Sequence, residues 1–146
     1  MRLNVQSDYA LRLLMHLAVN RDELITIAEV AERFGISKNH LMKVANTLGR
    51  GGFIETLRGR SGGLRLARPA ASIPVGDVVR RMEGDFAIVE CFKGGRGECM
   101  ITPACRLKTV FHEATEAFLA VLDRHTIGDL VKRNRELETL LGLERA

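Results

Sequence analysis

The sequence predicts a mainly α-helical protein: a winged helix-turn-helix domain joined to a long C-terminal dimerisation helix and a cysteine-rich loop. Three observations favour this class. Two short helical patterns are separated by a glycine-containing turn, as in a helix-turn-helix. A strand, a glycine-rich turn and a second strand follow directly, as in a winged helix. A helical repeat of apolar residues then runs without a breaker from Pro103 to about Arg124.

The length of 146 residues suits one domain, or a small domain with an appendage. Hydrophobic residues make up 46% of the chain, which is enough for a packed core. The sequence shows neither a signal peptide nor a run of about 18 apolar residues able to span a bilayer. We therefore expect a cytoplasmic protein with no membrane partner, in which thiols stay reduced.

A first helix is expected from Ser7, whose hydroxyl can cap it, with Asp8 in the opening turn where a carboxylate suits the helix dipole. Its apolar positions recur at helical spacing: Ala10, Leu13, Leu14, Leu17 and Ala18. Thr26 and Glu29 form a capping-box pattern, which predicts a second helix reaching about Arg33.

The turn Phe34-Gly35-Ile36 is expected to end this second helix, and Ser37 to cap a third helix that stops at Gly51-Gly52. The apolar stripe of the third helix is expected to face the core: Leu41, Val44, Ala45 and Leu48. In helix-turn-helix proteins the start of the second helix of the motif reaches base edges. The residues at that position here are Ser37, Lys38, Asn39, His40 and Lys43.

A hairpin is predicted next, with strands at residues 53–58 and 64–67 and a glycine-rich turn at residues 59–63. Short arginine-bearing elements of this kind enter the minor groove of DNA, where the potential is most negative. The wing residues expected to contact DNA are Arg58, Arg60, Ser61 and Arg65.

The charge distribution agrees with a nucleic-acid partner. Residues 33–68 carry one acidic residue, Glu55, and eight basic ones: Arg33, Lys38, Lys43, Arg50, Arg58, Arg60, Arg65 and Arg68. A basic block inside a folded pattern suits a phosphate backbone. Charge alone would equally fit a solvated basic face, so the order of helix-turn-helix and hairpin decides for DNA.

The C-terminal half is expected to be helical. Pro69 and Pro74 punctuate a linker before a short helix at residues 75–83, and Pro103 suits the N1 position of a long helix with Cys105 in its first turn. The long helix carries an apolar seam, for which we favour a dimer interface over a cover for the core: Leu107, Val110, Phe111, Ala114, Phe118, Val121 and Leu122. A further capping pattern predicts a helix over about residues 127–135, and residues 136–143 are expected to pack as a last turn or two.

The three cysteines of the chain lie in one short stretch, Cys91, Cys99 and Cys105, with Gly94, Gly95 and Gly97 between the first two. Glycines let such a loop fold back so that three thiols converge. An odd number of cysteines cannot pair off as disulfides within one chain, and in a reducing compartment such a cluster indicates metal binding or redox sensing. Three unrelated cysteines would be the simplest alternative.

The chain resembles the iron–sulfur winged-helix transcription regulators of the NsrR/IscR type along essentially its whole length. The matching residues are the opening SDYALRLLMHLA, the helix-turn-helix and wing SKNHLMKVANTLGRGGFIETLRGRSGG, the three-cysteine loop and ITPACRL. ITPACRLK and the later TIGDLV are similar to the nitric-oxide-sensing branch, and MRLNVQSDYALR and FAIVECF also to the iron-responsive RirA branch.

The resemblance implies a homodimeric DNA-binding repressor on a palindromic operator, whose iron–sulfur cluster responds to nitric oxide, with iron or cluster status as the alternative signal. Cys91, Cys99 and Cys105 would hold the cluster, 4Fe–4S or else 2Fe–2S, and Asp8 of the partner subunit occupies the fourth-ligand position. The histidine that the IscR branch places just after its third cysteine is absent, since position 107 is leucine, which favours Asp8 as the fourth ligand or an open iron site. The interval from Cys91 to Cys99 is longer than in the well-known members, which is a departure from the family pattern.

The expected units are residues 1–83 as the winged helix-turn-helix domain, 84–106 as the cluster loop, and 107–146 as the dimerisation and C-terminal helices. A structural zinc site with His112 or an aspartate, a thiol-only sensor and an electron carrier remain as other classes. No nucleophile–base pattern, phosphate loop or metalloprotease motif indicates an enzyme. His16, His112 and His125 are expected to be satisfied core or surface residues.

Overall fold

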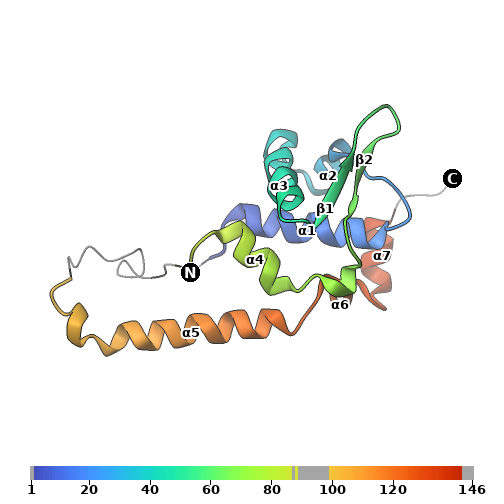
Figure 1. Ribbon diagram of the computed structural model, residues 1–146. Helices are drawn as coiled ribbons and strands as arrows, with labels where there is room; N and C mark the ends of the chain where they lie inside the picture. Colours follow the sequence, from blue (N-terminus) through green and yellow to red (C-terminus); the bar gives the residue numbers. More distant parts are fainter. Residues whose placement is uncertain (1, 87, 89–98, 143–146) are drawn as a thin grey trace.

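A computed structural model describes residues 2–86, 88 and 99–142 of the chain. It is mainly α-helical with one two-stranded sheet, as the sequence predicts (Figure 1). The elements are, in order, α1 (Val5–Val19), α2 (Ile27–Phe34), α3 (Lys38–Arg50), β1 (Ile54–Leu57), β2 (Gly63–Leu66), the 3-10 turn η1 (Ala70–Ser72), α4 (Val75–Glu83), the 3-10 turn η3 (Thr102–Ala104), α5 (Arg106–Asp123), α6 (Ile127–Val131) and α7 (Arg135–Leu141).

Helix α1 begins earlier than the sequence predicts, and its cap is a different residue. Asn4 caps it through its side-chain oxygen, which accepts a hydrogen bond from the Ser7 backbone N–H at 2.8 Å. Ser7 is buried instead, and its hydroxyl donates to Glu83 Oε1 at 2.7 Å. Glu83 Oε1 also accepts the Asn4 backbone N–H at 2.8 Å. These hydrogen bonds hold the start of α1 against the end of α4.

The helix-turn-helix is confirmed almost residue for residue. Thr26 and Glu29 form the full capping box that opens α2, and Gly35 ends the helix in the left-handed conformation, φ 64°. Ser37 then caps α3 by accepting the His40 N–H at 3.3 Å. The predicted apolar stripe of α3 is buried in the core: Leu41, Val44, Ala45 and Leu48.

The wing is an antiparallel hairpin in which Ile54 pairs with Leu66 and Leu57 with Gly63. The first strand is one residue shorter at each end than predicted, whereas the second has the predicted length but begins one residue earlier, at Gly63. Leu64 also exchanges two backbone hydrogen bonds with Ile25, at 2.7 and 3.0 Å, so the hairpin is fastened to the segment before α2.

The core unites the N-terminal helices with the C-terminal end of the chain. Ile127 of α6 is fully buried in the same cluster as Leu13, Leu41 and Val78. Asn20 Nδ2 donates to the Leu141 carbonyl at 2.9 Å, and Arg33 donates to the carbonyls of Leu140 and Gly142 at 2.8 and 3.3 Å, which holds α7 against α1 and α2. We call this body, residues 2–83 with α6 and α7, the head.

Helix α5 leaves the head as a long arm (Figure 1). Its start differs from the prediction: Pro103 lies in the separate turn η3, and Cys105 is extended (φ −80°, ψ 106°) as the residue before the first turn of α5. Leu119 is the buried residue of α5, whereas Leu107, Val110 and Val121 are 58%, 56% and 46% exposed. Among the described residues, no helix is long and apolar enough to cross a membrane.

The helix after α5 is also shorter than predicted. Thr126 and Asp129 form the expected capping box, but α6 ends at Val131. Arg133 then takes a positive φ of 56°, which turns the chain into α7. Residues 136–143 were expected to form a last turn or two, and α7 occupies residues 135–141, with Leu141 buried against the head.

Candidate nucleic-acid interface and cysteine site

The outer face of α3 is polar and exposed. Lys38, Asn39 and Lys43 project from it into solvent, as predicted. Asn46 and Arg50 continue the same stripe at the next turns, and Met42 beside them is 47% exposed. Arg50 belongs to the predicted basic block, whereas Met42 and Asn46 were not predicted, although they lie three residues after Asn39 and Lys43 on the same helix. In Figure 1 α3 and the wing project from the side of the head opposite to α5.

His40 differs from its neighbours because its ring is half-buried. The ring lies edge-on against Tyr9 of α1, with centroids 5.0 Å apart. Its backbone N–H is held by the Ser37 cap. His40 therefore connects the recognition helix to α1 as well as lying at the predicted interface.

The wing places Arg58, Arg60 and Ser61 at an exposed turn. Two glycines give the turn its shape: Gly59 has φ 114°, and a Cβ on Gly62 would lie 2.1 Å from the Leu57 carbonyl oxygen. Arg65 is also exposed, but its guanidinium pairs with Glu55 across the strands. The wing therefore offers Arg58 and Arg60 without a described ion pair.

Not all of the predicted basic block is available to a partner. Arg33 binds the carbonyls at the end of α7, and Arg68 lies over the Phe53 ring at 5.2 Å. Both serve the packing of the head. The available positive charge is thus concentrated on α3 and the wing, where Lys38, Lys43 and Arg50 face solvent.

Two of the three cysteines lie in the described residues, and both carry free thiols. Cys99 is exposed and Cys105 is half-buried directly before α5. Cys91 and its glycine-rich neighbours lie outside the described residues. Within residues 2–86, 88 and 99–142, no three His, Cys, Asp or Glu side chains gather into a metal site.

Asp8 lies on the exposed side of α1 and is bound by Arg12 through two contacts, Nη2 to Oδ2 at 2.8 Å and Nε to Oδ1 at 3.2 Å. The Arg12 guanidinium also lies 5.7 Å from the centre of the Tyr9 ring and 5.9 Å from that of Phe34. A chain of contacts therefore runs from Asp8 through Arg12 and Tyr9 to His40 on the recognition helix.

His16 departs from the expectation of a satisfied histidine. It is 1% exposed in the core, and neither ring nitrogen has a hydrogen-bond partner. Its ring lies edge-on to Phe34, 6.1 Å between centroids. Burial lowers the pKa of His16, with the Arg33 charge adding to this effect and Glu29 opposing it. The side chain is therefore held neutral.

Comparisons with known proteins assign the family. The Rrf2 family profile, described as "Iron-dependent Transcriptional regulator", matches residues 3–133. The chain belongs to the Rrf2 family. It is 49% identical over 145 residues to the HTH-type transcriptional regulator NsrR of Bacillus subtilis, covering 99% of each chain.

Solved structures agree with this fold. The oxidized form of Staphylococcus aureus CymR superposes with a TM-score of 0.73 at 26% identity, over 90% of this chain and 97% of that one. IscR of T. potens gives a TM-score of 0.75 at 23% identity, over 100% of this chain and 94% of that one. The family assignment and the relationship to NsrR make this Rrf2 protein an HTH-type transcriptional regulator rather than an enzyme, as the sequence indicates.

Proposed function

We propose that this Rrf2 protein is a homodimeric repressor whose iron–sulfur cluster senses nitric oxide, and that modification or loss of the cluster releases the operator. The relationship to NsrR along the whole chain carries this proposal, because it includes the α1 segment with Asp8 as well as the α3 and wing segments. Redox or iron status is the alternative signal for the same site.

The donor set fits such a cluster. Thiolates hold the iron of iron–sulfur clusters, and Cys99 and Cys105 are both free to do so. With Cys91 they supply three ligands, and a 4Fe–4S cluster with a fourth, oxygen ligand is favoured over 2Fe–2S. A bound cluster supplies an iron site that small molecules can attack. Asp8 of the partner subunit is the proposed oxygen ligand, since its carboxylate is exposed and only an arginine on its own helix turn has to be exchanged for iron.

The contacts of Asp8 offer a route to the DNA-binding surface. A carboxylate that binds iron would leave Arg12, and Arg12 lies against the Tyr9 ring. Tyr9 in turn contacts His40 in the first turn of α3. Iron binding by Asp8 would therefore change the contacts of Arg12 and Tyr9 that hold the start of α3, the recognition helix, in place.

The arm formed by α5 is the proposed dimer interface. Its exposed apolar residues Leu107, Val110 and Val121 share one face, on which a second copy can pack. Two-fold related heads read half-sites of a palindrome about 34 Å apart.

We propose DNA contacts for the residues on α3 and the wing: Ser37, Lys38, Asn39, His40, Lys43, Arg58, Arg60, Ser61 and Arg65. The proposal keeps the three predicted units: the DNA-binding domain (1–83), the cluster loop (84–106), and the dimerisation and C-terminal helices (107–146). It also keeps the cytoplasmic location.

The test compares three states of the protein. Anaerobically purified protein is assayed for iron, sulfide and visible absorbance, and then for DNA binding as the cluster-loaded, nitric-oxide-treated and cluster-free forms. The DNA is a duplex enriched from a random library by the loaded form. We expect the loaded form to bind at least about a hundredfold more tightly, since a switch requires a few kcal/mol between states. Equal affinities in all three states would contradict the proposal.

A regulator that responds through its thiols or through zinc is the second candidate, and the exposed Cys99 thiol favours it. Such a protein would be colourless when purified without oxygen. It would contain either stoichiometric zinc or thiols that form reversible disulfides. The same metal and sulfide assay separates it from the iron–sulfur sensor.

A further inference from the structure

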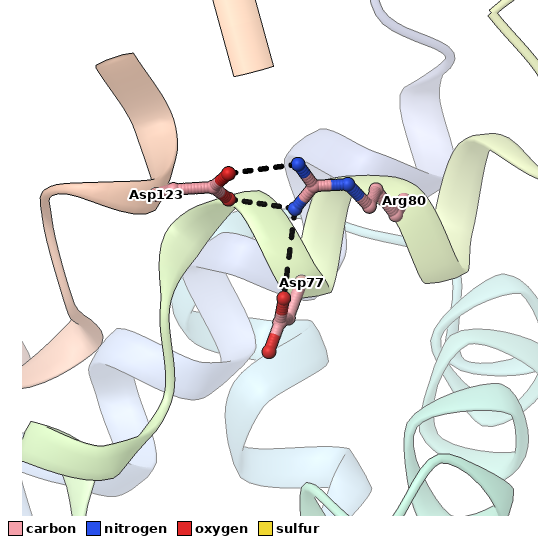
Figure 2. A network of polar contacts seen from close by, with 3 residues as sticks. All are labelled: Asp77, Arg80 and Asp123. Carbon is pink, nitrogen blue, oxygen red and sulfur yellow. Dashed lines mark hydrogen bonds and ion pairs between the residues drawn. The ribbon is translucent and has the colours of Figure 1, made fainter. Parts of the chain in front are cut away.

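An ion-pair network links the long arm to the head at the point where α5 ends. The Arg80 guanidinium of α4 makes a two-pronged bond to the Asp123 carboxylate, Nη1 to Oδ1 at 2.6 Å and Nη2 to Oδ2 at 2.8 Å (Figure 2). Asp77, three residues before Arg80, lies 3.5 Å from Nη1. The hydrogen bond from Arg80 lowers the pKa of Asp123, so the pair stays ionised.

Gly76 allows the carboxylate to reach this position. A Cβ at Gly76 would lie 1.9 Å from Asp123 Oδ1 and 2.9 Å from Arg80 Nη1. Glycine is a poor choice within a helix, where alanine is the more favourable residue. Its presence in the first turn of α4 therefore fits the close approach of Asp123 rather than the helix.

Backbone hydrogen bonds fix the chain just after this pair. The Val75 N–H donates to the His125 carbonyl at 2.8 Å, and the Ile127 N–H donates to the Ile73 carbonyl at 2.9 Å. The end of α5 is thus held by main-chain bonds on one side and by Arg80 on the other. The rest of α5 extends away from the head (Figure 1).

We infer that Arg80, Asp123 and Gly76 form a joint that sets the direction of α5 relative to the head, and thereby the distance between the two heads on DNA. This inference rests on the proposed dimer. The 18 residues of α5 span about 27 Å. A turn of about 10° at the joint would move its far end by about 5 Å, more than the rise of about 3.4 Å per base pair. A small change at the joint therefore alters the spacing between half-sites that the dimer binds best.

The experiment measures spacing preference. Wild-type protein selects duplexes from a pool with about 30 randomised base pairs, long enough for two half-sites one helical turn apart. Kd is then measured for the selected duplex and for the same duplex with one base pair inserted between the half-sites. The spacing ratio is the Kd for the duplex with the insertion divided by the Kd for the selected duplex. This ratio is compared among the wild type, Arg80→Gln, Asp123→Asn, Gly76→Ala and the control Arg124→Gln. Arg124 is exposed and follows Asp123 directly.

We expect the ratio to fall by about fivefold in the three joint variants and to stay unchanged in Arg124→Gln, because a two-pronged exposed pair is worth about that much in an equilibrium. A purely structural role would lower both affinities equally and leave the ratio constant. Gly76→Ala keeps both charges and favours the helix, so it tests the geometry even if a charge variant folds poorly. Unchanged ratios in all three variants would overturn the inference alone. Failure of the wild type to select paired half-sites would overturn the proposed dimer as well.

Discussion

At the scale of single residues, the proposed iron ligand Asp8 already has an ion-pair partner on its own helix. In the described chain its carboxylate is bound by Arg12. An exposed pair of this kind, four residues apart on a helix, is worth only about 0.3–0.5 kcal/mol. A metal ligand bond can therefore replace the pair easily.

We predict that Asp8→Ala weakens the cluster while leaving the fold intact. The variant should lose its cluster absorbance in air several-fold faster than wild type, because a ligand is removed and only a weak surface pair is lost. Asp22→Ala, an exposed aspartate beyond the end of α1, is the control. Identical spectra, nitric-oxide response and DNA affinity in Asp8→Ala and wild type would exclude Asp8 as a ligand.

The buried His16 makes stability depend on pH. Its pKa is lowered by burial in the folded protein, whereas the unfolded chain has an ordinary value of 6.5. As pH falls below about 6.5, His16 is protonated in the unfolded chain but stays neutral in the folded protein, so the free energy of unfolding decreases. His16→Leu should flatten this loss between pH 7.5 and about 5.5 in urea unfolding of the cluster-free protein. His125→Gln, an exposed histidine, should keep the wild-type pH dependence. An equally steep loss in His16→Leu would contradict the prediction.

Single-residue predictions from the sequence were reliable where the partner is local. The capping pairs Thr26–Glu29 and Thr126–Asp129 formed as expected, because each partner is three residues away. Ser7 was wrong as a cap, because its hydroxyl bonds Glu83, 76 residues later. Nothing in the local pattern separates it from Asn4, which is an equally good cap.

At the scale of elements, the arginines of the wing differ in whether their charge is free to contact DNA. Arg65 is already paired with Glu55, whereas Arg60 lies exposed in the turn. We predict that Arg60→Gln lowers DNA affinity and reduces the slope of log K against log salt by about 1.8, the contribution of one phosphate contact in each subunit of the proposed dimer. Arg65→Gln should change the slope less. Gel shifts over a salt series measure both, and equal slopes in Arg60→Gln and wild type would contradict a phosphate contact.

Element boundaries were harder to predict where two conformations suit the same residue. Proline at position 103 fits the first turn of an α-helix and a 3-10 turn alike, and the chain adopts the latter before Cys105. The interior of α5 was predicted correctly, since its apolar period is long and unbroken.

At the scale of the whole molecule, the sequence could not show that the C-terminal helices α6 and α7 pack against the N-terminal helices. Ile127 and Leu141 are buried against the head, although their helices follow the long arm. Return contacts of this kind depend on tertiary packing rather than on period or capping. The arm is thus bounded at both ends, by the cysteine stretch before it and by the Arg80–Asp123 joint after it.

The exposed apolar face of that arm gives a test of assembly. We predict that Val110→Lys raises the dimer dissociation constant by at least about a hundredfold, because the two Val side chains across a two-fold interface lose a burial of about 1.5 kcal/mol each and two charges are placed there instead. Light scattering after gel filtration over a dilution series measures the change. Thr109→Lys introduces the same charge at an exposed neighbouring position off the apolar seam and should leave the dimer intact. A dimer equally stable in both variants would place the interface elsewhere, because a lysine cannot remain charged within a dry contact without partners.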